Sequence, residues 1–462
     1  MTGQPVSLTA FWKSFRAKVV GRKFVQDVGI LTVTNFVGAA LSFAQAILVA
    51  RWLGPELYGV AALVMSYPTL VYTFFDARSS EASVKYLSEF RARNELDRVR
   101  ATCKLGYAVD FAIASIAFLV VAVSAHWAAR SIVNRPEMTS LIIVCAAAFI
   151  PQALIGTSRS VLTVLGRFRL TALVEALMTI LRVVLVLGLV MSGWQVTGVV
   201  WGNAIAMIAT GLVYGVLAWV LTLRAWGGSP FQGNWQTLKG RWREILGFLA
   251  YSDLNALLGL ISKQSDVLLL GYFRNPTEVG YYKLAKNLAS GLSHLTGPLR
   301  SVTYPKLVHL WSAGRLSDFR RVLYKLAVTL AIPLTFGVIL SVLAAPAAIQ
   351  YFLGESYLEA SVPTQFLLVA TGLRLIGFWV SPFYLATGQV RLLTVFALAG
   401  AIGAIPIYAV CILFWGASGL AVSRLALTLL TDTTAAVLIM LWGIRTNYGR
   451  LSPKPMGSPI GN

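Results

Sequence analysis

The sequence predicts an all-α polytopic membrane protein with twelve transmembrane helices, arranged as two parallel-repeat six-helix lobes around a central cavity. Three observations support this fold class. Of the 462 residues, 57% are hydrophobic and only 12% are charged, whereas a soluble protein carries about 25% charged residues. Apolar runs close to the roughly 20 residues that cross a bilayer recur along the chain. Short motifs also recur about half a chain apart.

Each predicted span is an apolar run bounded by polar or basic turns. Prolines within several runs are expected to kink the helices, which neighbouring helices can accommodate. No connecting segment is long enough for a folded domain outside the membrane. The twelve spans cover residues 28–50, 59–77, 105–125, 139–158, 170–190, 196–222, 246–272, 279–299, 326–345, 363–385, 392–413 and 419–442.

The Lys and Arg residues lie mostly in alternate loops, and this pattern predicts the orientation. With the N-terminus in the cytoplasm, 29 of the 39 fall in cytoplasmic segments, 4 in external loops and 6 within spans. Cytoplasmic loops of membrane proteins carry such an excess. We therefore expect a multi-pass protein of the cytoplasmic (inner) membrane with both termini in the cytoplasm. The net charge of +21 then reflects topology and not nucleic-acid binding.

Three motifs recur at nearly one spacing. "GPELYG" at 54–59 corresponds to "NPTEVG" at 275–280, where the prolines and the final glycines are each 221 residues apart. "LGRFR" at 165–169 matches "TGQVR" at 387–391, and "WQVTG" at 194–198 matches "WGASG" at 415–419. Six spans separate the copies, so both halves have the same orientation in the membrane, as in parallel-repeat transporters.

The repeat and the loops together predict the domain organisation. A cytoplasmic linker connects two lobes of six spans each, and a basic tail precedes the first lobe. The predicted segments are the tail 1–27, the N-lobe 28–222, the linker 223–245, the C-lobe 246–442 and a cytoplasmic tail at 443–462.

The first hairpin, "AILVARWLGPELYGVAALV", resembles the polysaccharide-export branch of the multidrug/oligosaccharidyl-lipid/polysaccharide exporter superfamily, which includes O-antigen and lipid II flippases. "LGRFR" and "QSDVLLLGYFRNPTEVGYYKLAKNL" extend the resemblance over nearly the whole chain. It implies two six-helix bundles around a central cavity. It also implies that a lipid-linked saccharide moves from the cytoplasmic to the periplasmic leaflet by alternating access. The partner would be a polyprenyl-diphosphate-linked oligosaccharide, such as an O-antigen, capsule or exopolysaccharide repeat unit, with other membrane proteins of glycan assembly as further partners.

Charged residues within the predicted spans are the candidate functional residues. A charged side chain at the bilayer centre costs about 2.5–3.5 kcal/mol or more, so such side chains are expected to face a cavity or one another. The cations are Arg182, Lys263, Lys283, Lys286, Arg374 and Arg424, and the acids are Asp110, Glu175, Asp253, Asp266 and Asp432.

Two interpretations remain open for the charges of the second lobe. Lys283 and Lys286 are three residues apart and share a helix face, as do Lys263 and Asp266. Asp266 either pairs with one of the lysines at 283 and 286, or these lysines bind the diphosphate of a polyprenyl carrier together with Arg374. Lys263 is a further candidate for binding the diphosphate or the anionic headgroup. Lys binds phosphate as a point charge, and Arg adds a bidentate fork.

The first lobe offers fewer candidates. Arg182 is a candidate for binding the anionic headgroup, although a structural pair with Glu175, seven residues earlier on the same face, is the favoured alternative. Arg78 and Lys85 are candidates for attracting that headgroup from the cytoplasmic leaflet, or Lys85 is only an orienting charge. Asp266 and Glu175 are the candidates for ion coupling. Arg424 and Asp432 are expected to serve contacts between helices.

Several motifs are absent from the sequence. It contains no GxxxxGK[ST] phosphate-binding loop, and its 3 Cys and 3 His residues show no metal-ligand spacing. We therefore expect no cofactor, no metal site and no catalytic residues, with transport driven by an ion gradient or the membrane potential. The alternatives are a multidrug or cation exporter on the same scaffold, and a membrane glycan polymerase or ligase.

Overall fold

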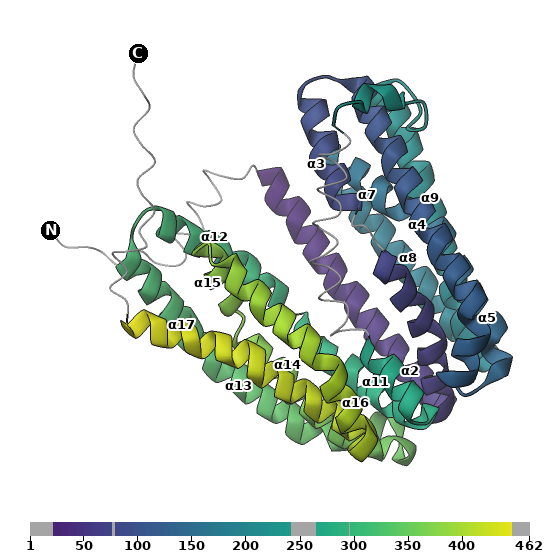
Figure 1. The fold of residues 1–462 in the computed structure, drawn as a ribbon, viewed down its shortest axis with the longest axis vertical. Coiled ribbons are helices and arrows are strands. Elements are labelled where there is room, and N and C mark those ends of the chain that lie inside the picture. Colours follow the sequence, from purple (N-terminus) through teal and green to yellow (C-terminus); the bar gives the residue numbers. More distant parts are fainter. Residues whose placement is uncertain (1–21, 76–78, 242–264, 295, 446–462) are drawn as a thin grey trace. The chain divides into compact units, whose positions relative to one another are not determined.

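A computed structural model of the protein describes residues 22–75, 79–241, 265–294 and 296–445, and within them every regular element is helical (Figure 1). A helical stretch at 265–273 precedes α11. Shorter 3-10 and π segments are η1 (Pro136–Met138), η2 (Val190–Trp194), η3 (Trp235–Leu238), η4 (Glu355–Ala360) and η5 (Leu429–Thr433). The α-helices are α2 (Arg22–Phe75), α3 (Ser79–Ala92), α4 (Leu96–Ser131), α5 (Thr139–Ala147), α6 (Phe149–Gln152), α7 (Leu154–Val164), α8 (Phe168–Leu189), α9 (Gln195–Trp226), α11 (Pro276–Ser293), α12 (Thr296–Ser312), α13 (Leu316–Leu353), α14 (Ser361–Ile376), α15 (Val380–Ala386), α16 (Val390–Thr428) and α17 (Thr434–Arg445).

The protein is a multi-pass membrane protein. Within the described part of the chain, 7 helical stretches are long and apolar enough to cross a membrane. Three of these are at least twice as long as the roughly 20 residues that one crossing needs. They cover Val33–Phe75, Phe168–Trp226 and Thr394–Ile439.

Each of the three long stretches is interrupted by a glycine with non-helical backbone angles, at Gly54, Gly193 and Gly416. Divided there, the 7 stretches give ten crossings, which coincide with ten of the predicted spans. The two remaining predicted spans, at 246–272 and 279–299, fall largely outside the described residues or on the more polar helix α11. The total of twelve spans therefore stays a prediction.

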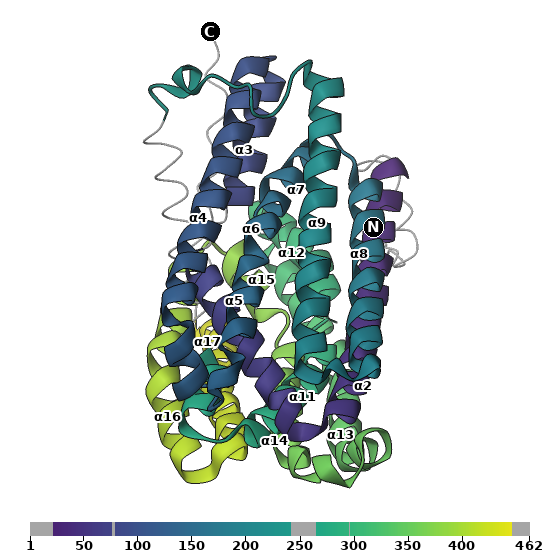
Figure 2. The same ribbon diagram turned by 90° about the vertical axis from the view of Figure 1, so that its right-hand side faces the viewer.

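Contacts within the chain divide it into two compact units, which are described separately. Unit 1 contains residues 1–45, 71–124 and 140–254. In this unit α9 packs against α6, α7 and α8, and α7 also packs against α3 (Figure 2). Buried aromatic side chains, among them Tyr86, Phe90, Tyr107, Tyr214 and Trp226, fill the core between these helices.

The segment after α9, which the sequence predicts as a linker, packs onto α3 and α4 within unit 1. The guanidinium carbons of Arg98 and Arg241 lie 5.7 and 5.6 Å from the centroid of the buried Phe90 ring. Arg98 Nε donates to the carbonyl of Thr237 (3.1 Å), and Arg241 Nη1 donates to Glu89 Oε1 (2.7 Å). The hydrogen bond from Arg241 holds the pKa of the Glu89 carboxyl below its usual value. Side chains of α3 and α4 thus attach this segment to the rest of unit 1.

Unit 2 contains residues 46–70, 125–139 and 255–462. Its central helix is α14, which packs against α11, α13 and α16 (Figure 1). A second core forms where α12 packs on α15, with Phe319, Phe378 and Phe383 buried in it. The clustering groups residues by contact, so the predicted lobe boundaries at 28–222 and 246–442 stay a prediction.

The predicted repeat is present in the backbone conformation. Gln195 has φ 44° and ψ −125°, and Gly416, 221 residues later, has φ 55° and ψ −133°. The turns of the "LGRFR" pair also match, because Arg167 N donates to Leu162 O and Gln389 N donates to Tyr384 O, both at 2.9 Å. Two further pairs, which no predicted motif marks, share a left-handed residue at a spacing of 220. The matching left-handed positions are Asn94 and Gly314, Asn134 and Gly354, Gly166 and Gly388, and Gln195 and Gly416.

The two proline–glycine turns contact each other directly within unit 2. A Cβ atom on Gly59 would lie 1.8 Å from the carbonyl oxygen of Pro276, and one on Gly280 would lie 2.0 Å from the carbonyl oxygen of Pro55. Neither position accommodates a side chain, because the opposing atom is backbone. The two copies of the motif therefore pack against each other in a reciprocal contact, which we call the paired turns (residues 54–59 and 275–280).

Side chains next to the paired turns add polar contacts. Tyr357 Oη donates to the carbonyl of Ala50 (2.9 Å), and Asn287 Nδ2 donates to Tyr58 Oη (2.8 Å). Asn275 caps α11 by accepting from the backbone N–H of Glu278 (3.0 Å), and the following residue is a proline at the first helical position. Glu278 in turn accepts from the backbone N–H of Ala417 (2.8 Å). The second turn is therefore connected to the bend in α16.

We expect Gly280→Ala to destabilise the protein, because the added Cβ meets the Pro55 carbonyl. Overpacking of this kind costs about 1–3 kcal/mol. The melting temperature of the purified protein in detergent measures the effect. Gly291→Ala is the matched control, since Gly291 lies on the same helix and has nothing within 4 Å of an added Cβ. Equal melting temperatures for the two variants would contradict the reciprocal contact.

Candidate functional site

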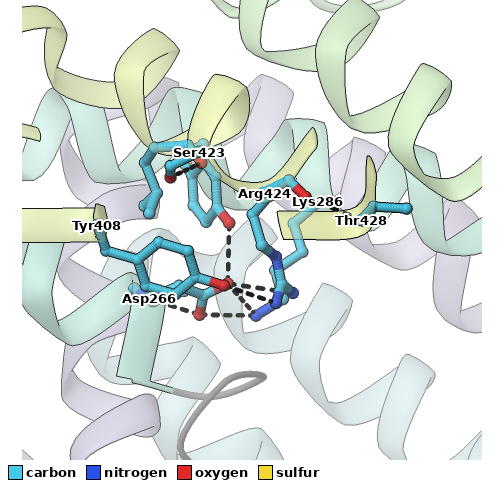
Figure 3. A network of polar contacts seen from close by, with 9 residues as sticks. Asp266, Lys286, Tyr408, Ser423, Arg424 and Thr428 are labelled. Atoms are coloured by element: carbon cyan, nitrogen blue, oxygen red, sulfur yellow. Dashed lines mark hydrogen bonds and ion pairs between the residues drawn. The ribbon is translucent and has the colours of Figure 1, made fainter. Parts of the chain in front are cut away.

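A fully buried carboxylate, Asp266, lies at the centre of a charged network in unit 2 (Figure 3). It stands on the helical stretch at 265–273, and its two cationic partners come from α11 and α16. Lys286 Nζ lies 2.9 Å from both carboxylate oxygens, and Arg424 Nη2 lies 3.4 Å from Oδ2. The carboxylate is thus held by two cations from two other helices.

Neutral groups complete the network. Tyr282 Oη donates to Asp266 Oδ2 (2.8 Å), and the backbone N–H of Val267 donates to Oδ1 (2.8 Å). Arg424 Nη1 donates to the hydroxyl of Tyr408 (3.3 Å), which is also part of the network in Figure 3. Both carboxylate oxygens are therefore saturated by hydrogen bonds and ion pairs. A buried ion pair is stable only when such additional hydrogen bonds are present.

The helix α11 presents its polar residues at helical spacing. Tyr282 and Lys286 are four residues apart, which places both on the face that meets Asp266. The pairing of Asp266 with Lys286, one of the two alternatives left open by the sequence, is therefore present. Among the described residues, one carboxylate thus contacts two cations in this network.

Lys283 adds a third cation to this region. It lies three residues before Lys286 on α11 and is half-buried. Among the described residues, no hydrogen bond or ion pair involves its ammonium group. The positive charge in this part of unit 2 therefore exceeds what the described carboxylates neutralise.

The other predicted site residues of unit 2 lie apart from this network or outside the described residues. Arg374 on α14 pairs with Asp432 in η5, with its Nε 2.8 Å from Oδ2. This contact joins two helical elements, as expected for Asp432. Lys263 lies outside the described residues.

In unit 1 the predicted pairing of Glu175 with Arg182 is wrong. Glu175 on α8 pairs instead with Arg159 on α7. Arg182, two turns further along α8, reaches α2, where its Nη2 donates to Ser42 Oγ (2.6 Å). The two residues share a helix, but each finds its partner on a different neighbouring helix.

Of the two remaining predicted site residues, only Lys85, on α3, is described. The Nζ atom of Lys85 lies 4.7 Å from the centroid of the Tyr86 ring, and Lys85 is exposed. Arg78 lies outside the described residues.

Arg424 serves a contact between helices, as expected, but the sequence did not identify Asp266 as its partner. Two further contributors were not expected, and one of them, Arg159, lies just outside the predicted span 139–158. The role of Tyr408 could not be predicted, because it is one of 17 tyrosines and is 16 residues from the arginine that it contacts. The four-residue spacing of Tyr282 and Lys286, by contrast, can be recognised from the sequence alone.

We expect Asp266→Ala to be strongly destabilising, because it leaves Lys286 and Arg424 as uncompensated charges. Removing one partner of a buried ion pair costs about 3–5 kcal/mol. Asp318→Ala breaks the Arg315–Asp318 pair, whose side chains are 60% and 34% exposed, and is expected to cost at most about 1 kcal/mol.

Thermal unfolding of the purified variants at matched detergent concentration compares the two changes. Adding Lys286→Met to Asp266→Ala removes one of the stranded cations and should recover part of the lost stability. A melting temperature of Asp266→Ala equal to that of Asp318→Ala would show that the network contributes no more than an exposed pair.

Comparison with solved structures shows which fold the two units belong to. The structure of the lipid II flippase MurJ in an inward closed conformation matches with a TM-score of 0.71 and 13% identity, over 91% of this chain and 89% of that chain. An inward-facing multidrug resistance MATE family transporter of the MOP superfamily matches with a TM-score of 0.69 and 14% identity, over 88% and 96%. A MATE transporter from Vibrio cholerae matches with a TM-score of 0.61 and 13% identity, over 91% and 97%.

At these identities the structures establish the fold. No curated protein sequence matches the chain significantly. The sequence profile described as "Polysaccharide biosynthesis protein" matches residues 24–311, which is more than half of the chain. The chain therefore belongs to the polysaccharide biosynthesis protein family, with the transmembrane fold of the MOP superfamily.

Proposed function

We propose that the protein is a flippase that moves a polyprenyl-diphosphate-linked oligosaccharide across the cytoplasmic membrane by alternating access. The oligosaccharide would be an O-antigen, capsule or exopolysaccharide repeat unit. Membership of the polysaccharide biosynthesis family and the fold shared with MurJ support this proposal. In the proposed topology twelve helices form two lobes, and both termini lie in the cytoplasm.

The observation that carries the proposal is the surplus of positive charge beside Asp266. Two cations contact this one carboxylate, and Lys283 lies on the same helix with no ion-pair partner among the described residues. A surplus cation in a membrane helix is costly unless an anion or water compensates it. A diphosphate supplies such an anion, and Lys is a common phosphate ligand.

We propose different parts for the predicted cations. Lys283 is the primary diphosphate ligand in our proposal. Lys286 keeps its contact with Asp266, 2.9 Å away, and attracts the diphosphate through its positive charge. Arg374 is half-exposed at 44% despite its pair with Asp432, so it can exchange that carboxylate for phosphate. Lys263, Arg78 and Lys85 remain candidates for attracting the headgroup.

Ion coupling is assigned to Glu175 in preference to Asp266. Both oxygens of Asp266 already accept from Lys286, and a further cation would meet two positive charges there. Among the described residues Glu175 forms an ion pair with Arg159 alone, and its side chain is 24% exposed. Exchange of that arginine for a proton or sodium ion is the step we propose.

The MATE neighbours motivate the second candidate, a multidrug or cation exporter on the same scaffold. A cationic drug requires an acidic and poorly compensated site. Each of Glu175, Asp266 and Asp432 contacts a cation in this chain, which disfavours that alternative.

We expect Lys283→Ala to reduce surface glycan strongly in a strain that depends on this protein. Loss of a charged hydrogen bond of about 1.5–3 kcal/mol weakens diphosphate binding about 10- to 100-fold. Lys283→Arg should retain much of the export. The measurement is surface glycan per cell at equal membrane expression, and Lys325→Ala, an exposed lysine on α13, is the control.

Full glycan display in cells carrying Lys283→Ala would contradict the proposal that this lysine binds the diphosphate. Drug sensitivity without glycan loss in cells lacking the protein would instead favour the multidrug exporter.

A further inference from the structure

In unit 1, α8 lies beside the first part of α2 (Figure 2), and a cation on α8 has no carboxylate partner among the described residues. The guanidinium of Arg182 on α8 donates from Nη2 to Ser42 Oγ at 2.6 Å. Ser42 Oγ donates onward to the carbonyl oxygen of Gly38 at 2.7 Å. The serine thus orients the arginine but does not neutralise it.

One donor of the Arg182 guanidinium is not used within the described part of the chain. Its Nε atom is buried and has no hydrogen-bond partner among the described residues. No described carboxylate forms an ion pair with this guanidinium, because Glu175 is paired with Arg159. A half-buried guanidinium in a membrane helix, with an unused donor, calls for a negatively charged acceptor.

An unused acceptor lies on the same helix face as Ser42. Gln45 is three residues after Ser42 on α2, and its Oε1 atom is buried without a hydrogen-bond partner among the described residues. A buried amide oxygen is normally satisfied by an N–H or O–H donor. The region therefore presents a positive donor on α8 and, one turn after its serine partner on α2, a neutral acceptor, and neither atom has a partner among the described residues.

We infer that Arg182, Ser42 and Gln45 form a subsite for a sugar that carries a negatively charged oxygen next to a hydroxyl group. An ionised diphosphate offers only acceptors, so it satisfies Arg182 but not the Gln45 oxygen. A neutral sugar donates to Gln45 but leaves the guanidinium without an anion. A sugar phosphate or a uronic acid satisfies both. This inference rests on the proposed function and assigns a sugar of the substrate, with the acidic group that it carries, to unit 1.

The two sources of such a group are the sugar joined to the carrier phosphate and an acidic sugar within the repeat unit. Binding to the purified full-length protein in nanodiscs, measured by isothermal titration calorimetry, distinguishes them. The probes are glucose 1-phosphate for the first source, glucuronic acid for the second, and farnesyl diphosphate as an anion without a sugar. Whichever sugar probe loses more affinity in the variants identifies the source.

We expect Arg182→Gln to weaken binding of that sugar probe about tenfold or more, because a charged hydrogen bond is lost. Gln45→Leu should weaken it about three- to tenfold and leave farnesyl diphosphate binding unchanged. Arg182→Lys should retain part of the affinity, since it keeps the charge. Gln152→Leu is the matched control, because the Gln152 amide oxygen is also buried and unbonded in unit 1. Equal melting temperatures confirm that the variants are folded.

Wild-type affinity for both sugar probes in Arg182→Gln and Gln45→Leu would overturn the inference, as would an equal loss in Gln152→Leu. Lys283→Ala, tested with farnesyl diphosphate, separates this result from failure of the proposed function. If Lys283→Ala loses affinity for farnesyl diphosphate while the unit 1 variants bind the sugars normally, the flippase proposal stands and the subsite does not. If the wild-type protein binds none of the three probes, both are overturned.

Discussion

The contact of the Asp266 carboxylate with Lys286 and Arg424 is the interaction on which the polar part of unit 2 depends. A bare charge is costly within a membrane, so a carboxylate there requires cations close by. These cations come from α11 and α16, and their contacts with the stretch at 265–273 therefore join three helical segments. Lys283 lies three residues from Lys286 on the same helix and forms no ion pair among the described residues. The same constraint applies in unit 1, where the described part of the chain places a serine and no acid beside Arg182. In our proposal both regions use this positive charge to bind a ligand.

Backbone contact provides the second constraint. In the paired turns, Gly59 and Gly280 each lie against the carbonyl oxygen of the other turn's proline, where no side chain fits. The two copies of this repeated motif therefore pack directly on each other within unit 2. Glu278 extends this contact to the bend at Gly416, whose left-handed backbone matches that of Gln195 one repeat earlier. Hydrogen bonds at the turns near Gly166 and Gly388 follow the same pattern.

Much of the fold was predictable because apolar runs and basic loops are local features of the sequence. Ten of the spans and the three motif pairs follow from composition and spacing alone. The Asp266–Lys286 contact was one of two alternatives, since charges in membrane helices tend to pair. Arg424 was missed as the second partner because it lies far along the chain, and only the packing of α16 brings it to Asp266. The Glu175–Arg182 prediction failed for a similar reason. Helical spacing places both on one helix, but it does not say which neighbouring helix each one faces, and Arg159 lies on α7.

Translocation of a lipid-linked saccharide by the purified protein tests the account most directly. Proteoliposomes containing the protein and a short-chain polyprenyl-diphosphate-linked disaccharide would be treated with a membrane-impermeant glycosidase, and the protected fraction followed over time. The account predicts that wild-type protein exposes the inner-leaflet half of the substrate to the enzyme, and that Lys283→Ala does so much more slowly. A protected fraction that stays at one half with the wild-type protein, as in protein-free liposomes, would contradict it. Equal rates for the wild type and Lys283→Ala would contradict the role of the surplus charge.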